Sequence, residues 1–460
     1  MRGIAADTRY MLRDRIFLSK AFRIALPVAM QGMLNTLVNL ADTLMIGSLG
    51  ESTIAAVGLA NKVFFVFTLL VFGIVSGSGV LAAQYWGNQD VKNIRKVMGL
   101  ALTLSMIGAL CFVIPCVLAP EKVMRIFTTS QSSIEIGAAY LTIAVFSYPF
   151  TAITNTLVAM QRAVNRVKAP VLITCMAIVV NICLNYVFIF GHFGAPALGA
   201  PGAAIATLTA RSLEAAAIIL VIYLGKSPIA GHIREMFGYS KEFLRQFART
   251  TVPVIANEFT WGLGTTLYSL AYGRMGDNAV AAITIATTIQ DLVVVLFQGL
   301  SAATAVILGN EMGAGKLRRA ERYARNFFIL QFMITVIAAL VCVGIRWQII
   351  GLYNVSAGVA RDISLCLIVF ALYMPAKMFN YVNVVGVLRS GGDTTASLFL
   401  DCTGVWLIGV PLAFLGGLYF KFPIYIVYAL VLSEEIYKFV LGYIRYRQKK
   451  WLRNLAAELS

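Results

Sequence analysis

Twelve long apolar stretches constrain what this chain can fold into. A membrane-spanning helix needs about 20 apolar residues to cross roughly 30 Å of hydrocarbon. A transmembrane barrel would instead need alternating strands of about ten residues, whereas these runs are continuously apolar. The sequence therefore predicts an all-α membrane protein with twelve transmembrane helices. They are expected at about 24–46, 57–84, 97–118, 137–159, 170–190, 202–223, 251–272, 280–308, 326–345, 363–387, 396–417 and 423–444.

The composition agrees with this prediction. Of 460 residues, 59% are hydrophobic and 13% are charged, and the mean hydropathy is +0.80. A soluble core of this size could not bury so much apolar surface. We therefore expect an integral protein of the cell (inner) membrane.

The second half of the chain repeats the first at an offset of 226 residues. The matched positions include Pro27 with Pro253, Gly50 with Gly276, Gly87 with Gly313, and Pro149 with Pro375. Repeated halves are typical of secondary transporters, in which one half moves against the other. Six spans in each half predict two pseudo-symmetric lobes in parallel orientation, at 24–223 and 251–444, joined by a cytoplasmic linker at 224–250.

The net charge of +17 raises the question of nucleic-acid binding. Most Lys and Arg residues, however, fall in segments on one side of the predicted topology, as the positive-inside rule requires. We therefore expect both termini in the cytoplasm, basic loops near anionic lipid headgroups and no nucleic-acid partner. The sequence predicts an amphipathic interfacial segment at residues 1–23, without a signal-peptide cleavage site. It also predicts a basic tail at residues 445–460.

Asp42 is the ionisable residue that most strongly suggests a site in the first half. It lies in the outer half of the first predicted span, where a charge is unfavourable unless it is paired or hydrated. Asn181 and Asn185 share one face of the fifth span at a similar depth. A carboxylate and two carboxamides at one level predict a site for a coupling cation, Na⁺ or a proton. The alternative is that Asp42 is a hydrogen-bonded structural group.

A second polar set lies in the other half. Glu258, Lys377, Asn380 and Asp401 have comparable depths in spans 7, 10 and 11, and Asp291 lies in the middle of span 8. One interpretation is a structural salt bridge of Lys377 with Glu258 or Asp401. The other is a substrate or second cation site. Arg211 and Glu214, three apart in span 6, are expected to pair.

The sequence does not favour an enzyme. Both histidines lie outside the predicted spans, all seven cysteines lie inside them, and no nucleotide-binding loop is complete. We expect no cofactor, no disulfide and no metal centre apart from a coupling Na⁺. Pro27 and Pro253 lie in the first turns of spans 1 and 7, where the repeat predicts a hinge or bend common to both halves, or a shared packing feature.

Several motifs together resemble the multidrug and toxic compound extrusion (MATE) family of the MOP superfamily. They are LADTLMIGSLGESTIAAVG (40–58), QYWGNQD (84–90), NICLNYVFIFG (181–191), LGNEMGAGKLRRAERYA (308–324), LRSGGDTT (388–395) and KKWLRNL (449–455). The resemblance implies two lobes around a V-shaped central cleft and export of organic cations or amphipathic compounds in exchange for Na⁺ or H⁺. It also implies that Asp42, with Asn181 and Asn185, couples to the cation, that Pro27 lies near a bend, and that Glu258 acts in the second lobe.

The resemblance leaves some points open. Some branches of the family carry Asp where this chain has Asn185, and one has Asp where it has Asn380, so the coupling ion is not decided by sequence. The alternative function is a flippase for lipid-linked precursors, which the superfamily also contains. We expect a monomer that acts on small molecules.

Overall fold

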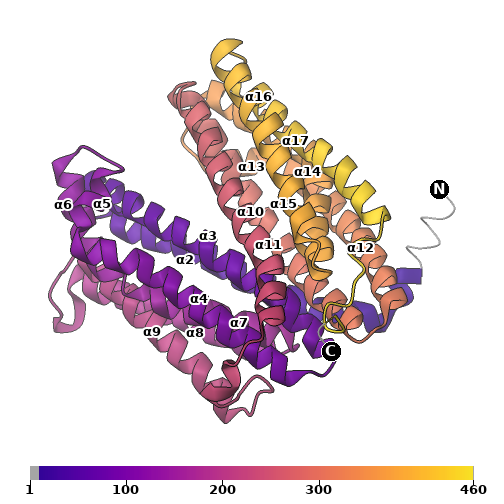
Figure 1. Cartoon of the computed structure of the whole chain (residues 1–460). Coiled ribbons are helices and arrows are strands. Elements are labelled where there is room, and N and C mark those ends of the chain that lie inside the picture. Colours follow the sequence, from indigo (N-terminus) through magenta and orange to yellow (C-terminus); the bar gives the residue numbers. More distant parts are fainter. Residues whose placement is uncertain (1–9, 459–460) are drawn as a thin grey trace. The chain divides into compact units, whose positions relative to one another are not determined.

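The computed structural model describes residues 10–458, and this part of the chain contains helices, turns and loops but no strand. The first nine residues of the expected N-terminal segment 1–23, and the last two of the tail, lie outside the described residues. Twelve helical segments follow the twelve predicted stretches (Figure 1). The all-α membrane fold is therefore confirmed.

The segments of the first repeat are α2 (Arg15–Gly47), α3 (Glu51–Gly87), α4 (Val91–Leu118), α6 (Gln131–Ala144) with α7 (Ser147–Ala163), α8 (Lys168–Phe190) and α9 (Ala200–Leu224). Those of the second are α10 (Lys241–Gly273), α11 (Asp277–Gly313), α12 (Leu317–Gly344), α14 (Ala357–Tyr381) with η3 (Val382–Leu388), α15 (Thr394–Thr403) to η5 (Leu415–Tyr419), and α17 (Ile424–Arg447). The bounds of α10, α11 and α12 are those of α2, α3 and α4 shifted by 226, which confirms the repeat.

Length and apolarity identify nine of the described helices as candidate spans, or ten if α6 and α7 are counted as one span bent by 49°. The bend precedes Pro149, which lies in the first turn of α7, where a missing N–H is tolerated. The two remaining segments, α10 and α17, are the more polar ones. They carry Glu258, and Glu434, Glu435 and Lys438, respectively. Their polarity is a first sign of a site.

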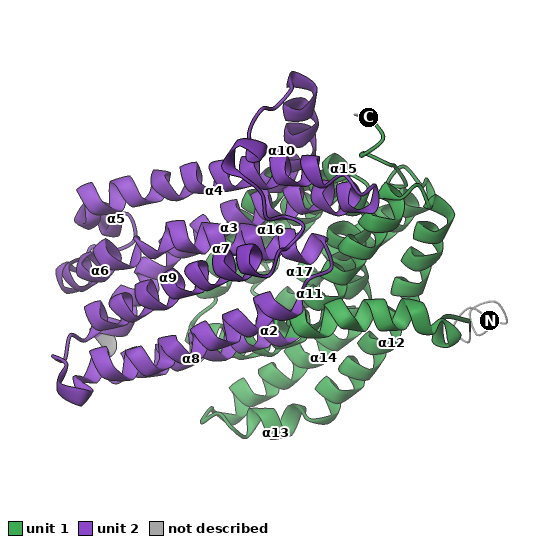
Figure 2. Cartoon of the chain, turned by 90° about the horizontal axis from the view of Figure 1, so that it is seen from below, with its two compact units in different colours: residues 1–29, 256–460 green, residues 30–255 purple. Residues whose placement is uncertain are grey.

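The chain forms two compact units, shown in green and purple in Figure 2. Unit 1 contains residues 1–29 and 256–460, and unit 2 contains residues 30–255. Both boundaries fall inside a helix, after Ala29 in α2 and after Ile255 in α10, at positions equivalent by the repeat. Each boundary lies two residues after the matched proline, Pro27 or Pro253. The lobe limits expected from the sequence, 24–223 and 251–444, stay a prediction.

The first part of each repeat's first helix packs on the other repeat. In unit 1, Phe17 of α2 is fully buried against Phe327 (ring centroids 4.9 Å apart), and Lys20 pairs with Glu311 at 3.1 Å. In unit 2, the equivalent Phe243 of α10 stacks on Tyr85 at 6.5 Å.

The polar contacts of this exchange are also equivalent. The Tyr85 hydroxyl donates to Gln246 Oε1 at 2.9 Å, and Tyr85 and Gln246 are the repeat partners of Glu311 and Lys20. We call this arrangement the helix exchange.

The C-terminal tail packs closely on unit 1. The Trp451 side chain is fully buried, and its Nε1 donates to the Tyr446 carbonyl at 3.2 Å. Arg445 binds both carboxylate oxygens of Asp393 at 2.6 and 2.7 Å. Gly391 lies so close to the tail that a Cβ there would be 1.4 Å from the Trp451 carbonyl oxygen. Only glycine fits at this position without moving the backbone of the tail.

We therefore expect Gly391→Ala to destabilise the protein by about 1–3 kcal/mol or more, because the added methyl overpacks a contact between two backbones. The thermal unfolding midpoint in detergent should fall clearly. Gly79→Ala in α3 is the matched control, since nothing lies within 4 Å of its added Cβ. An unchanged midpoint for Gly391→Ala would show that the tail is not fixed at this turn.

Candidate functional site

The three polar residues expected to act together in the first repeat are brought together in unit 2. Asn185 of α8 donates through Nδ2 to Asp42 Oδ1 of α2 at 2.5 Å, and lies 3.4 Å from Asn181 Oδ1. Asn181 Nδ2 reaches Thr207 Oγ1 of α9 at 3.4 Å. Both asparagines are buried and Asp42 is half-buried. The four-residue spacing of the asparagines on one helix face produces this arrangement.

An oxygen of this group is left without a partner. Asn185 Oδ1 is buried and accepts no hydrogen bond from any described residue. A buried acceptor without a donor is unfavourable by about 1–3 kcal/mol. Beside a carboxylate, such an oxygen is suited to a hard cation such as Na⁺, which prefers oxygen ligands. The donor set therefore fits a small cation.

The positive charge nearest to Asp42 is already engaged. Arg211 of α9 acts electrostatically on Asp42 but forms an ion pair with Glu214 at 2.8 Å. This pair confirms the expected partnership of Arg211 and Glu214. The hydroxyl of Tyr140 from α6 donates to Asn61 at 3.5 Å and also lies within reach of the Asp42 charge. Asp42 is thus left without an ion-pair partner of its own among the described residues.

The second polar set lies in unit 1, but its partners differ from those expected. Glu258 of α10 pairs with Arg389 at 2.8 Å, and Arg389 is only 1% exposed. Asp401 of α15 accepts a hydrogen bond from Asn257 Nδ2 at 3.0 Å. The expected salt bridge of Lys377 with Glu258 or Asp401 is wrong, since Lys377 bonds Glu435 of α17 at 3.0 Å.

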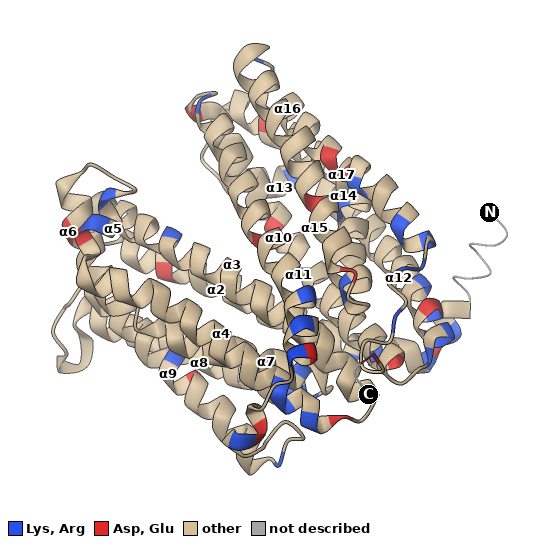
Figure 3. Cartoon of the chain, in the orientation of Figure 1, with Lys and Arg blue, Asp and Glu red and all other residues tan. Residues whose placement is uncertain are grey.

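Adjacent glutamates of α17 organise this part of unit 1. Glu434 and Glu435 both bind the Lys438 ammonium, at 3.2 and 3.3 Å. The Tyr268 hydroxyl donates to Glu434 at 2.6 Å, and Asn380 Nδ2 donates to Glu435 Oε2 at 2.9 Å. We call Tyr268, Lys377, Asn380, Glu434, Glu435 and Lys438 the α17 network. Acidic and basic positions occur partway along α14 and α17 (Figure 3).

The backbone beside the α17 network leaves room for its side chains. The segment η4 (Gly404–Gly409) is a π-helical turn, a wide turn that is frequent at functional sites. A Cβ at Gly404 would lie 2.9 Å from Lys438 Cδ, and one at Gly409 would lie 2.0 Å from the Tyr268 hydroxyl oxygen. Any side chain at either glycine would displace part of the network.

Sequence reasoning missed Arg389, Glu434, Glu435 and Tyr268. Arg389 follows the predicted span 363–387, in a stretch expected to be a loop, and the two glutamates lie inside the predicted span 423–444 without a predicted role. The signal that could have found the glutamates is their spacing. Lys438 follows them by four and three residues, which is the spacing of helical ion pairs.

Asp291 lies apart from the buried residues. It is exposed on α11, on the helix face that also presents Thr284, Thr288 and Gln298. Its neighbour Gln290 accepts a hydrogen bond from the Tyr428 hydroxyl at 2.6 Å. The charge of Lys377 reaches Asp291. This face of unit 1 therefore presents an accessible carboxylate near the lysine of the α17 network.

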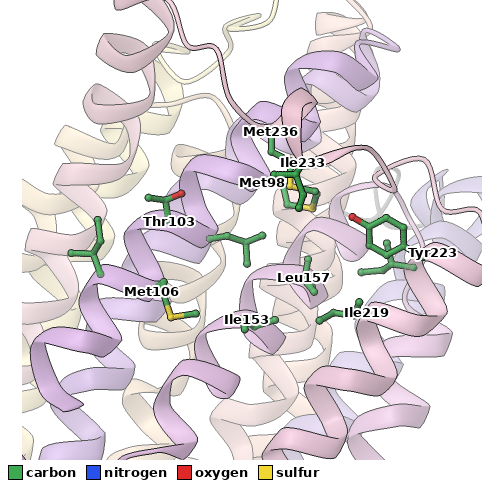
Figure 4. Close-up of a pocket in the computed structure, with 12 residues that line it drawn as sticks. Met98, Thr103, Met106, Ile153, Leu157, Ile219, Tyr223, Ile233 and Met236 are labelled. Carbon is green, nitrogen blue, oxygen red and sulfur yellow. The ribbon is translucent and has the colours of Figure 1, made fainter. Parts of the chain in front are cut away.

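Unit 2 also contains an apolar cavity of about 530 Å³. Met98 and Met106 of α4, Leu157 of α7, Tyr223 of α9 and Met236 of the short helix η2 (Ile233–Met236) contribute to its lining (Figure 4). No charged side chain is among its described lining residues. It is therefore a different kind of site from the two polar groups.

Comparison with known proteins identifies the family. The MatE family model matches residues 27–187 and 240–415. The chain is 22% identical over 434 residues to the uncharacterized transporter YisQ of Bacillus subtilis (strain 168), covering 94% of this chain and 95% of the relative. It is 25% identical over 417 residues to the multidrug resistance protein MdtK of Yersinia enterocolitica serotype O:8 / biotype 1B (strain NCTC 13174 / 8081), covering 89% of each.

A solved structure has the same fold. The outward-facing conformation of a multidrug resistance MATE family transporter of the MOP superfamily superimposes with a TM-score of 0.85 at 21% identity. The match covers 96% of both chains. The chain therefore belongs to the MatE family, whose members are transporters and not enzymes.

Proposed function

We propose that this protein is a secondary antiporter that exports organic cations or amphipathic compounds in exchange for Na⁺ or H⁺. The observation that carries the proposal is the Asp42 group of unit 2, in which a half-buried carboxylate adjoins a buried amide oxygen without a donor. The likeness to the multidrug resistance protein MdtK supports the export part of this proposal. The protein acts as a monomer in the cell membrane, with both termini in the cytoplasm.

Asp42, Asn181 and Asn185 bind the coupling cation in this proposal. A sodium ion would take oxygens from all three residues, whereas a proton would reside on Asp42 alone. Either ion removes the charge of a carboxylate that has no ion-pair partner of its own among the described residues. Because a ligand shifts a conformational equilibrium by its differential affinity, the ion and the exported compound need only favour different states for exchange to follow.

Residues of unit 1 form the substrate or second cation site. Asp291 and Lys377 are partly accessible and would contact the exported compound directly. Glu258 pairs with Arg389, Asp401 accepts a hydrogen bond from Asn257, and Asn380 donates to Glu435. Glu258, Asp401 and Asn380 would therefore set the shape and charge of the site without contacting the exported compound.

The matched prolines act as bends between conformations. Pro27 and Pro253 lie inside α2 and α10, and each removes one backbone hydrogen bond from its helix. The boundary between the compact units follows each proline by two residues. A weakened helix at that point supports a hinge at both places.

Transport in liposomes tests this function. The purified protein would be reconstituted, and efflux of a fluorescent, permanently charged organic cation would be followed under an imposed Na⁺ gradient and then a pH gradient. We expect transport under one of the two gradients, which identifies the coupling ion. Transport under neither would contradict antiport and would favour the flippase, with lipid-linked precursors as the compounds to try next.

A further inference from the structure

Lys377 differs from the other charged members of the α17 network in its exposure. Its side chain is 23% exposed, whereas those of Lys438 and Glu435 are 5% exposed. It bonds Glu435 of α17 at 3.0 Å. Its own helix, α14, packs against α11, where Asp291 is exposed and feels the Lys377 charge. Lys377 therefore bonds a buried carboxylate and acts electrostatically on an accessible one.

Glu435 does not depend on Lys377 alone. Its Oε2 atom accepts from Lys438 at 3.3 Å and from Asn380 at 2.9 Å, and Asn380 also donates to the Glu435 backbone carbonyl at 2.7 Å. Glu435 would keep a buried cationic partner if Lys377 turned away. The ammonium of Lys377 is therefore the charge of the network that can turn away without leaving Glu435 unpaired.

The exposed face of α11 is polar in the middle of a long span. Asp291 shares this face with Thr284, Thr288 and Gln298, all exposed, in the middle of a long span. A carboxylate facing hydrocarbon at this depth is unfavourable, so such residues face the bundle interior or an aqueous cavity, and an exposed one is suited to the cavity. A dissolved compound that approaches Asp291 therefore enters the field of the Lys377 charge.

We propose that Lys377 is a tethered cation that sets the charge class of the exported compound, an inference that rests on the proposed transport function. A plain monovalent organic cation that binds at Asp291 is repelled by the neighbouring ammonium. A compound that carries a carboxylate next to its cationic group places the cation at Asp291 and the carboxylate at Lys377. The pair therefore favours zwitterionic amphiphiles over monocations of the same shape.

A matched pair of dyes tests this selectivity. Rhodamine B is zwitterionic near neutral pH, and its ethyl ester has the same fluorophore but only the positive charge. Binding of each to the full-length protein would be measured by fluorescence polarisation, and efflux of each in liposomes. We expect Lys377→Met to tighten binding of the ester about tenfold and to weaken binding of the zwitterion, because the nearby positive charge is lost. Lys377→Arg should keep the wild-type preference.

The outcomes separate this inference from the proposed function. If wild type transports the dyes but Lys377→Met leaves the ratio of the two affinities unchanged, charge selection by Lys377 is excluded while transport stands. If wild type transports neither dye nor the simple cation used above, the transport function itself fails. Asp291→Asn provides a second variant should Lys377→Met not fold. It should weaken binding of both dyes, and unchanged affinity for both would overturn the proposal.

Discussion

Replacing Asp42 by asparagine is expected to abolish gradient-driven efflux while the folded protein remains in the membrane. Asparagine keeps the shape of the side chain and can still bond Asn185, whose amide lies 2.5 Å from Asp42 in the wild type. The variant lacks the negative charge that a proton or Na⁺ would neutralise. The carboxamide cannot take up a proton near neutral pH, so proton coupling would be lost outright. Since an interaction with a charged group contributes about 1.5–3 kcal/mol, Na⁺ should bind about 10- to 100-fold more weakly.

Efflux would be measured in liposomes under whichever gradient drives the wild type, and folding would be checked by size-exclusion chromatography in detergent. Glu121→Gln is the matched control, because Glu121 is an exposed carboxylate that only pairs with Arg125 at 3.8 Å. The control should transport normally. Normal coupled efflux by Asp42→Asn would remove this group as the coupling site and direct attention to Glu258 and Asp401.

Removing the Lys438 charge is expected to produce the largest loss of stability. Lys438 is 5% exposed and holds both Glu434 and Glu435, which are adjacent on α17. In Lys438→Met the two carboxylates keep only Lys377 and their neutral donors between them. Breaking a buried ion pair from one side destabilises a protein by about 3–5 kcal/mol, because the remaining charge is buried without compensation.

Thermal unfolding in detergent or lipid nanodiscs would measure this effect. Lys449→Met is the control, since Lys449 pairs with Glu321 but is 56% exposed. An exposed pair of this kind contributes about 0–1 kcal/mol, so the control should unfold close to the wild type. Equal midpoints for the two variants would mean that the α17 network does not hold unit 1 together.

The sequence predicts the spans and the repeat well, because both depend on local composition and periodicity. The first three helices of the two repeats start and end at equivalent residues. The proximity of Asp42 to Asn185 was also expected, since similar depths and a shared helix face restrict where the side chains lie. The orphaned Asn185 oxygen could not be predicted, because it depends on which way one amide points.

The second site shows where sequence reasoning stops. Similar depth along the spans predicts Lys377 near Glu258 and Asp401, but depth does not say which helices are neighbours. In the fold α14 lies against α17, so Lys377 meets Glu435. Glu258 meets Arg389, a residue that composition places in a loop and the structure buries completely. Lateral neighbours in a helical bundle are set by packing over long sequence separations, which periodicity does not encode.

The helix exchange bears on how a chain of this kind could arise by gene duplication. A gene for one repeat would encode a first helix with no groove of its own to fill, and a groove on the next two helices with no helix to fill it. Two copies of such a product could satisfy each other, with Phe17 and Phe243 as the same residue in the two copies. Once fused, the copies could diverge, and the ion pair Lys20–Glu311 and the neutral pair Gln246–Tyr85 are what divergence at one ancestral contact would produce. Loss of either half would leave the other with a first helix and a groove that have no packing partner.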